Sequence, residues 1–167
     1  MSIINIQTGS LVITNGNDDA SVDITEVGGL SKAFLLYTAS GGSGGDDDYD
    51  QYFTRASFSN TSTLYFKRWD DSSDVNIEWQ VIECDGISVQ HKQLTISSGN
   101  SIQDTTIDEV DLAKSFIIRL GHYSDDSDVV EVATNSFRFV NSTTVRAERQ
   151  LDSSNTLYTG FQVIELE

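Results

Sequence analysis

The feature that most constrains this chain is an internal duplication of its sequence. Residues 79–83 (WQVIE) recur as residues 161–165 (FQVIE), 82 positions later, and residues 32–36 (KAFLL) recur as 114–118 (KSFII) at the same offset. Further matches with offsets of 81 and 83, among them residues 58–64 with 139–145, keep the same order along the chain. A fixed period of this length indicates one structural unit that occurs twice. The predicted units are residues 1–85 and 86–167.

Alternating apolar and polar side chains predict that each repeat is built from β-strands. Val75, Ile77, Trp79 and Val81 share one face of their segment, and polar residues occupy the positions between them. A period of two is typical of a half-buried antiparallel strand. The nearest approach to a helical stripe is a short stretch at residues 108–114. The predicted fold class is therefore all-β, with two tandem antiparallel β-sandwich-like repeats of about 80 residues.

Individual segments add local predictions. Residues 34–37 and 116–118 are continuously apolar, which predicts strands that are buried on both faces. Asp85 and Gly86 lie between two apolar runs and predict a tight hairpin. Cys84 ends an apolar strand and is expected to be buried; as the one Cys of the chain it forms neither an internal disulfide nor a thiolate zinc site.

The composition excludes several classes of partner. The chain has 10 Lys and Arg against 26 Asp and Glu, a formal net charge of −16. This charge repels the phosphates of nucleic acids and of anionic membrane surfaces. The sequence lacks an apolar run near the roughly 20 residues that a membrane-spanning helix needs. Its first residues carry no features of a secretory signal, so we expect synthesis in the cytoplasm.

Two acidic segments, residues 40–50 and 121–128, raise the question of a calcium site. Hard cations bind several carboxylate oxygens, and both segments are rich in Asp. The spaced ligands and closing Glu of an EF-hand are absent from both, which favours a solvated loop tip instead. We therefore expect no cofactor, with calcium kept as the one open alternative.

Aromatic side chains next to these polar segments are the candidate contact residues. Trp69 lies between Lys-Arg and Asp-Asp pairs, and Tyr49 and Tyr123 belong to the two acidic segments. Such side chains serve oligomer interfaces and sugar sites alike. His91 and His122 accompany no recognisable nucleophile or spaced acid pair, so we expect them to be exposed and non-catalytic. The sequence therefore predicts no catalytic residue, no metal ligand and no enzyme activity.

The order of motifs in each repeat resembles known families. Each repeat has a Lys-x-Phe strand, an acidic variable segment, a Phe-x-Asn segment and a closing Gln-Val-Ile-Glu strand, over residues 20–84 and 104–166. This order resembles that of H-type lectin-like sandwich domains and of duplicated β-domains in tailed-phage virion proteins. The resemblance implies a small antiparallel sandwich that often assembles as a trimer. In the lectin branch it also implies sugar binding near subunit boundaries.

These observations lead to one functional expectation and one alternative. We expect a non-enzymatic virion structural protein, a phage head decoration or tail-associated component that works through contacts with capsid or tail proteins. A homo-oligomer is expected, with a trimer favoured. The alternative is a carbohydrate-binding lectin or host-receptor adhesin, in which Trp69, Tyr49 or Tyr123 would contact a glycan.

Overall fold

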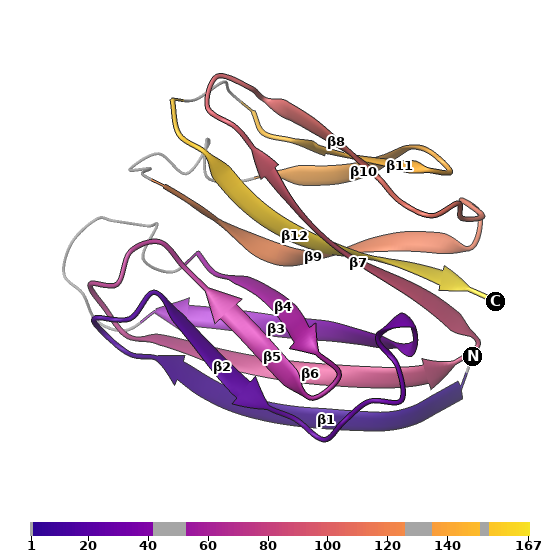
Figure 1. Cartoon of the computed structure of the whole chain (residues 1–167), viewed down its shortest axis with the longest axis horizontal. Helices are drawn as coiled ribbons and strands as arrows, with labels where there is room; N and C mark the ends of the chain where they lie inside the picture. The colour runs from indigo at the N-terminus through magenta and orange to yellow at the C-terminus, as the bar shows by residue number, and fades with distance from the viewer. Residues whose placement is uncertain (1, 42–52, 126–134, 151–153) are drawn as a thin grey trace.

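The computed structural model describes residues 2–41, 53–125, 135–150 and 154–167 (Figure 1). These residues form twelve β-strands and one short 3-10 turn, and every strand pairing is antiparallel. The elements are β1 (Ser2–Ile13), β2 (Asp19–Asp23), η1 (Leu30–Lys32), β3 (Ala33–Gly41), β4 (Arg55–Asn60), β5 (Thr63–Lys67), β6 (Val75–Asp85), β7 (Ile87–Ile96), β8 (Ile102–Thr106), β9 (Ser115–Ser124), β10 (Ser136–Asn141), β11 (Thr144–Glu148) and β12 (Leu157–Leu166). The described part of the chain contains no α-helix, and the all-β antiparallel prediction is confirmed.

The strands pair into three sheets. Two sheets have three strands each, in the orders β1-β6-β3 and β10-β11-β8, and the third has six strands in the order β2-β5-β4-β9-β12-β7. The six-stranded sheet joins both halves of the chain, because β4 meets β9 at the single pair Arg55 and Gly121. The sheets alone therefore do not divide the chain into two equal sandwiches. In Figure 1 the strands of residues 2–85 form the lower body and those of 87–166 the upper body.

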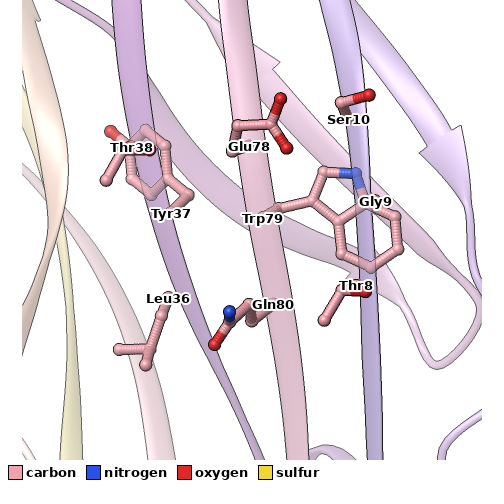
Figure 2. Close-up of a pocket in the computed structure, with 9 residues that line it drawn as sticks. All are labelled: Thr8, Gly9, Ser10, Leu36, Tyr37, Thr38, Glu78, Trp79 and Gln80. Carbon is pink, nitrogen blue, oxygen red and sulfur yellow. The ribbon is translucent and has the colours of Figure 1, made fainter.

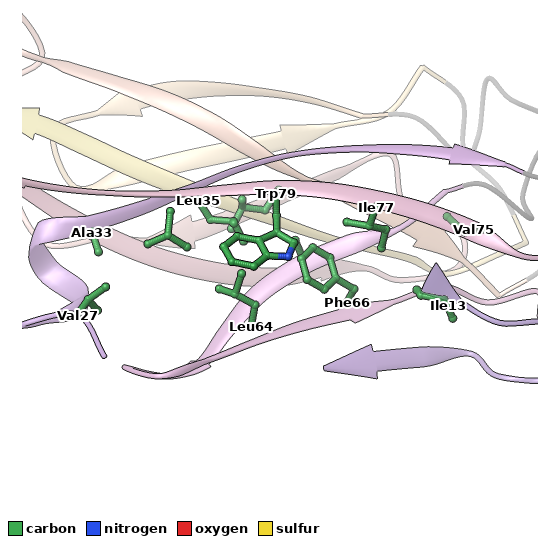
Figure 3. Close-up of a cluster of buried hydrophobic side chains, with 12 residues drawn as sticks. Ile13, Val27, Ala33, Leu35, Leu64, Phe66, Val75, Ile77 and Trp79 are labelled. Atoms are coloured by element: carbon green, nitrogen blue, oxygen red, sulfur yellow. The ribbon is translucent and has the colours of Figure 1, made fainter. Parts of the chain in front are cut away.

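The alternation along β6 gives it one buried face, as predicted. Val75, Ile77, Trp79 and Val81 are buried, and the residues between them are exposed. Figure 3 shows the indole of Trp79 directed toward β5, which closes the same core. Burying a side chain of this size stabilises the fold by roughly 1.5–3 kcal/mol. A second core in the upper body is built in the same way around β12.

The continuously apolar segments are not buried on both faces. Leu36 of β3 and Phe116 of β9 are exposed, so that prediction is wrong. The physical reason is that the outer faces of these strands are only partly covered by the other half of the chain. Part of this cover is a third apolar cluster, which contains Phe34, Ile82 and Cys84 from the lower body. Cys84 is buried as predicted.

The hairpin predicted at Asp85 and Gly86 is also wrong. These residues connect β6 to β7, but β6 lies between β1 and β3, whereas β7 pairs with β12. Gly86 has a φ of 73°, a left-handed conformation that favours glycine. The turn therefore carries the chain from the lower body into the upper body instead of folding one strand back on the other.

Candidate functional site

An open groove with a defined lining lies on the outer face of the β1-β6-β3 sheet (Figure 2). We use the term outer face for the side of this sheet that points away from the core around Trp79. The groove has a volume of about 400 Å³. Its lining residues are Thr8, Gly9, Ser10, Leu36, Tyr37, Thr38, Glu78, Trp79 and Gln80.

The floor of this groove depends on one glycine. A Cβ atom placed on Gly9 would lie 2.4 Å from Cζ2 of Trp79, far inside van der Waals contact. The absence of a side chain at Gly9 therefore lets the indole lie flat beneath β1, as Figure 2 shows.

The walls of the groove are polar, with little charge. They offer the hydroxyl groups of Thr8, Ser10 and Thr38, one amide from Gln80 and one carboxylate from Glu78. Hydroxyl and amide groups can both donate and accept hydrogen bonds, so this surface suits binding to a polar strand or ligand. Glu78 is the one acidic side chain of the lining, which gives the groove no partner for general acid–base chemistry.

A smaller hollow of about 280 Å³ lies where the two bodies meet. It is lined by Tyr37, Ala39, Phe53, Thr54, Arg119, Gly121 and His122. The Tyr37 hydroxyl donates to the carbonyl of Thr54 at 2.5 Å, and the Phe53 ring lies 4.6 Å from the His122 ring between centroids. The hollow thus joins side chains from β3 and β9 with the segment before β4.

Glycine is required here by both space and backbone conformation. Gly121 has a φ of 72°, and a Cβ on it would lie 1.9 Å from the Tyr37 hydroxyl oxygen. No other residue type could therefore bring the two bodies this close at this point.

Two titratable groups of the hollow, His122 and Tyr37, are held in their neutral forms beside the Arg119 guanidinium. Burial, with a smaller contribution from the Arg119 guanidinium, lowers the pKa of His122 to about 3. Arg119 donates a hydrogen bond to Nδ1 of His122. Burial raises the pKa of Tyr37 to about 12. Neither group changes its protonation near neutral pH, so the arrangement suits a structural polar contact better than proton transfer.

The structure places the predicted contact residues in different environments. Trp69 follows β5 and is 49% exposed, whereas Tyr123 lies within β9 and is only 5% exposed. The Tyr123 ring stacks on the Tyr158 ring, with 4.8 Å between the ring centroids. The guanidinium carbon of Arg55 lies over the Tyr123 ring, 5.1 Å from its centroid. In the described residues no ring contact joins Tyr123 to Trp69, and Tyr49 lies outside the described ranges.

Both histidines differ from the sequence prediction. His122 is 5% exposed because β9 continues to Ser124, where a loop was expected from Gly121 onward. His91 of β7 is also largely covered, and its Nε2 lies 2.9 Å and 3.1 Å from the carbonyl oxygens of Leu30 and Ala33. Both rings therefore help to join the two bodies.

The calcium alternative concerns segments that fall mostly outside the described ranges. Residues 42–52 and 126–134 contain most of the acidic side chains on which it rests. Elsewhere, within residues 2–41, 53–125, 135–150 and 154–167, no group of three or more His, Cys, Asp or Glu side chains could hold a metal ion. No helix in these ranges is long and apolar enough to cross a membrane.

Comparison with family models, curated protein sequences and solved structures gave no match to this chain. The resemblance found in the motifs therefore extends only to an all-β protein with antiparallel sheets.

Sequence reasoning missed the groove on the outer face. Its lining residues are spread over three strands and carry no motif. One signal was available, because residues 1–17 contain no charged side chain although the chain as a whole is strongly acidic. Depletion of charged side chains is a feature of the central part of many protein interfaces.

Proposed function

We propose that this protein is a non-enzymatic structural component of a virion and works through protein–protein contacts. The observation that carries the proposal is the character of β1. This strand has 12 residues, forms one edge of the β1-β6-β3 sheet and contains no charged side chain. Ile3 and Ile6 are 57% and 51% exposed on it. Apolar side chains exposed along a sheet edge are suited to contact with another protein.

The corresponding edge of the upper body is treated differently. β7 forms an edge of the six-stranded sheet, but it contains Lys92 and is covered in part by η1 through His91. Proteins commonly protect edge strands with lysine or with a covering segment. β1 contains no lysine, and its side chains Ile3 and Ile6 stay exposed although the segment at Thr25 bonds Gln7, which supports a role for it in binding.

We further propose that the chain consists of two copies of one unit, over residues 1–85 and 86–167. Support comes from hydrogen bonds that recur at matched positions. The amide of Gln7 bonds both backbone groups of Thr25, and the amide of Gln90 bonds both backbone groups of Asp108 in the same way.

Two buried arginines add to this support. The Arg68 side chain donates to the carbonyls of Thr14 and Asn17. Arg149 donates to the carbonyls of Ser97 and Asn100, at the matched positions of the second copy. Each arginine thus closes the turn after the first strand of its own copy.

The location on a phage head or tail rests on the motif order in the sequence. Immunogold labelling of intact particles, with particles from a deletion strain as control, tests it. We expect gold at a fixed position on the head or tail. A chain that stays with the unassembled fraction and never labels particles would contradict the proposal.

A carbohydrate-binding function is the second candidate, and the exposure of Trp69 favours it. An exposed indole beside Asp70 and Asp71 could stack on a sugar ring and hydrogen-bond its hydroxyl groups. A glycan array compares the unmodified chain with Trp69→Ala. Specific binding that is lost in the variant, at unchanged oligomer size, would move this candidate to first place.

A further inference from the structure

The contact between the two bodies is not symmetric, although both are built from matched strands. The upper body uses the outer face of its β7-β12-β9 strands, and this face covers the free edge of β3 together with η1 and β4. Gln162 bonds the backbone of Leu35, and His91 contacts the carbonyl oxygens of Leu30 and Ala33. Gly160 packs against β4, since a Cβ on it would lie 3.4 Å from Cγ of Arg55.

A small apolar cluster completes this contact. The upper body contributes Ile87, Val89, Ile118 and Ile164, and the lower body contributes Phe34, Ile82 and Cys84. Strand register gives the counterpart of each residue in the other body, since β6 and β12 occupy matched places between their neighbours.

Three of the four apolar contact residues of the upper body have counterparts that are uncovered in the lower body, and the fourth, Ile164, corresponds to Ile82, which belongs to the existing contact. Ile3, Ile6 and Leu36 take the places of Ile87, Val89 and Ile118. All three are exposed large apolar side chains, and Gln80, the counterpart of Gln162, is exposed beside them. We call this set, Ile3, Ile6, Leu36 and Gln80, the head surface.

Two of the three apolar contact residues of the lower body, Phe34 and Cys84, have uncovered counterparts in the upper body, whereas Ile82 corresponds to Ile164, which is buried in the existing contact. Phe116 and Leu166 take the places of Phe34 and Cys84, and Leu112 takes the place of Leu30. Phe116 is 44% exposed, and Leu112 and Leu166 are exposed as well. We call this set, Leu112, Phe116 and Leu166, the tail surface.

We propose that the head surface of one copy binds the tail surface of a second copy, and so repeats between chains the contact that joins the two bodies within a chain. The partner is a second copy because each open surface is the unfilled counterpart of one side of an existing contact. Such a contact is head-to-tail, so it closes into a ring or extends as a filament. The inference deepens the proposed structural function and rests on it.

Polar groups fit the same arrangement. Ile117 is the counterpart of Leu35, so the Gln80 amide would bond the backbone of Ile117 in the neighbouring copy. Glu78 and Ser136 are the counterparts of Gly160 and Arg55. In the existing contact the small Gly160 faces the large Arg55. In the proposed contact the large Glu78 would face the small Ser136. The exchange keeps the space between the surfaces filled.

Charge sets the conditions for this contact. Two copies of −16 repel each other, and salt screens that repulsion beyond roughly 8–10 Å at 0.1–0.15 M ionic strength. Two of the four head-surface residues, Ile3 and Ile6, lie on β1, which carries no charged side chain, so this part of the contact juxtaposes no like charges. We therefore expect association that strengthens as salt is added.

Sedimentation velocity on the full chain tests the proposal with two surface variants. Ile6→Asp blocks the head surface, and Phe116→Asp blocks the tail surface. Ile102→Asp is the matched control, because Ile102 is an exposed apolar side chain on β8 whose counterpart, Asp19, takes no part in the contact between the bodies. Circular dichroism and thermal melting establish that each variant is folded.

The expected result is specific to a head-to-tail contact. The unmodified chain and Ile102→Asp associate in 0.5 M salt, where the Debye length is about 4 Å, and each blocked variant alone is monomeric. An equimolar mixture of the blocked variants forms dimers that grow no further, because it retains one open head and one open tail.

Three results would overturn the proposal: an unmodified chain that is monomeric at every salt and protein concentration, a mixture that stays monomeric, or a Phe116→Asp variant that associates alone. The third would indicate symmetric pairing through β1. Particle labelling can still succeed in all three cases, so failure here is distinguishable from failure of the proposed virion function.

Discussion

The side-chain amide of Gln162 accepts a hydrogen bond from the backbone N–H of Leu35 at 2.7 Å and donates one to the carbonyl of the same residue at 2.8 Å. The two residues are 127 positions apart in the sequence. Leu35 lies in β3, at the edge of its sheet, where backbone groups lack a neighbouring strand. One buried glutamine therefore replaces that strand and fixes the upper body on the lower body.

Replacing this glutamine should separate the energetic roles of two matched residues. Gln162→Leu leaves the N–H and carbonyl of Leu35 buried without hydrogen-bond partners, and each unsatisfied group destabilises the folded state by about 1–3 kcal/mol. We expect a loss of about 2–4 kcal/mol in the free energy of unfolding, measured by urea denaturation. Gln80→Leu, at the exposed counterpart, should change it by less than about 0.5 kcal/mol. Equal effects of the two variants would show that the inter-body bonds contribute little.

A methyl group at Gly9 should disturb the floor of the groove. Gly9→Ala forces its Cβ to within 2.4 Å of the Trp79 ring, and we expect a loss of about 1–3 kcal/mol. Gly29→Ala is the control, because Gly29 is extended and a Cβ there would meet nothing closer than 3.9 Å. Thermal unfolding followed by tryptophan fluorescence measures both, and a Gly9→Ala variant as stable as the control contradicts the close packing of Trp79.

Burial of the two histidines predicts how stability depends on pH. Burial lowers the pKa of His122 to about 3 and also lowers the pKa of His91. Above the unfolded pKa of about 6.5, both states are neutral and the histidines contribute no pH dependence. Below a pH of about 6.5 the histidines are protonated in the unfolded chain but stay neutral in the folded chain. The free energy of unfolding therefore falls as the pH decreases, by up to about 1.4 kcal/mol per pH unit for each proton.

The variant His122→Asn isolates this contribution. Its free energy of unfolding, measured by urea denaturation at pH 7, 6 and 5, should fall less steeply than that of the unmodified chain. The comparison of slopes cancels the titration of the many carboxylates, which both proteins share. Parallel slopes would mean that His122 accepts a proton in the folded state.

Arg68 should contribute more to the free energy of unfolding than an arginine in a polar stretch of sequence usually does. Its side chain is fully buried and donates to the carbonyls of Thr14 and Asn17. Arg68→Met removes these donors, with an expected loss of about 2–4 kcal/mol in chemical denaturation. Arg138→Met, at an exposed arginine whose ion pair with Glu148 spans 3.6 Å, should cost less than about 0.5 kcal/mol. A loss at Arg138 as large as that at Arg68 would contradict this account.

The sequence predicts the strands well where one face of a strand is buried by its own body. The alternation along β6 is visible because Val75, Ile77 and Val81 face a local core, and the side-chain period of a strand is two. The burial of Cys84 follows from the same kind of pattern.

The contacts between the two bodies could not be predicted in this way. Gln80 and Gln162 belong to the same Gln-Val-Ile-Glu motif, yet one is exposed and the other is fully buried. The difference arises from which surface each body presents to the other, and this cannot be predicted from the local sequence, which is the same in both copies. The burial of His122 depends on the same contact, through Gly121 and its close approach to Tyr37.

Light scattering on the unmodified chain, with molar mass recorded across protein concentration and salt, tests the central claim most directly. A protein that works through its own surfaces should show a mass above the 18.4 kDa of one chain, and this mass should rise as salt screens the negative charge. A mass that stays at 18.4 kDa under all conditions, together with specific glycan binding on the same sample, would contradict the account and favour the lectin alternative.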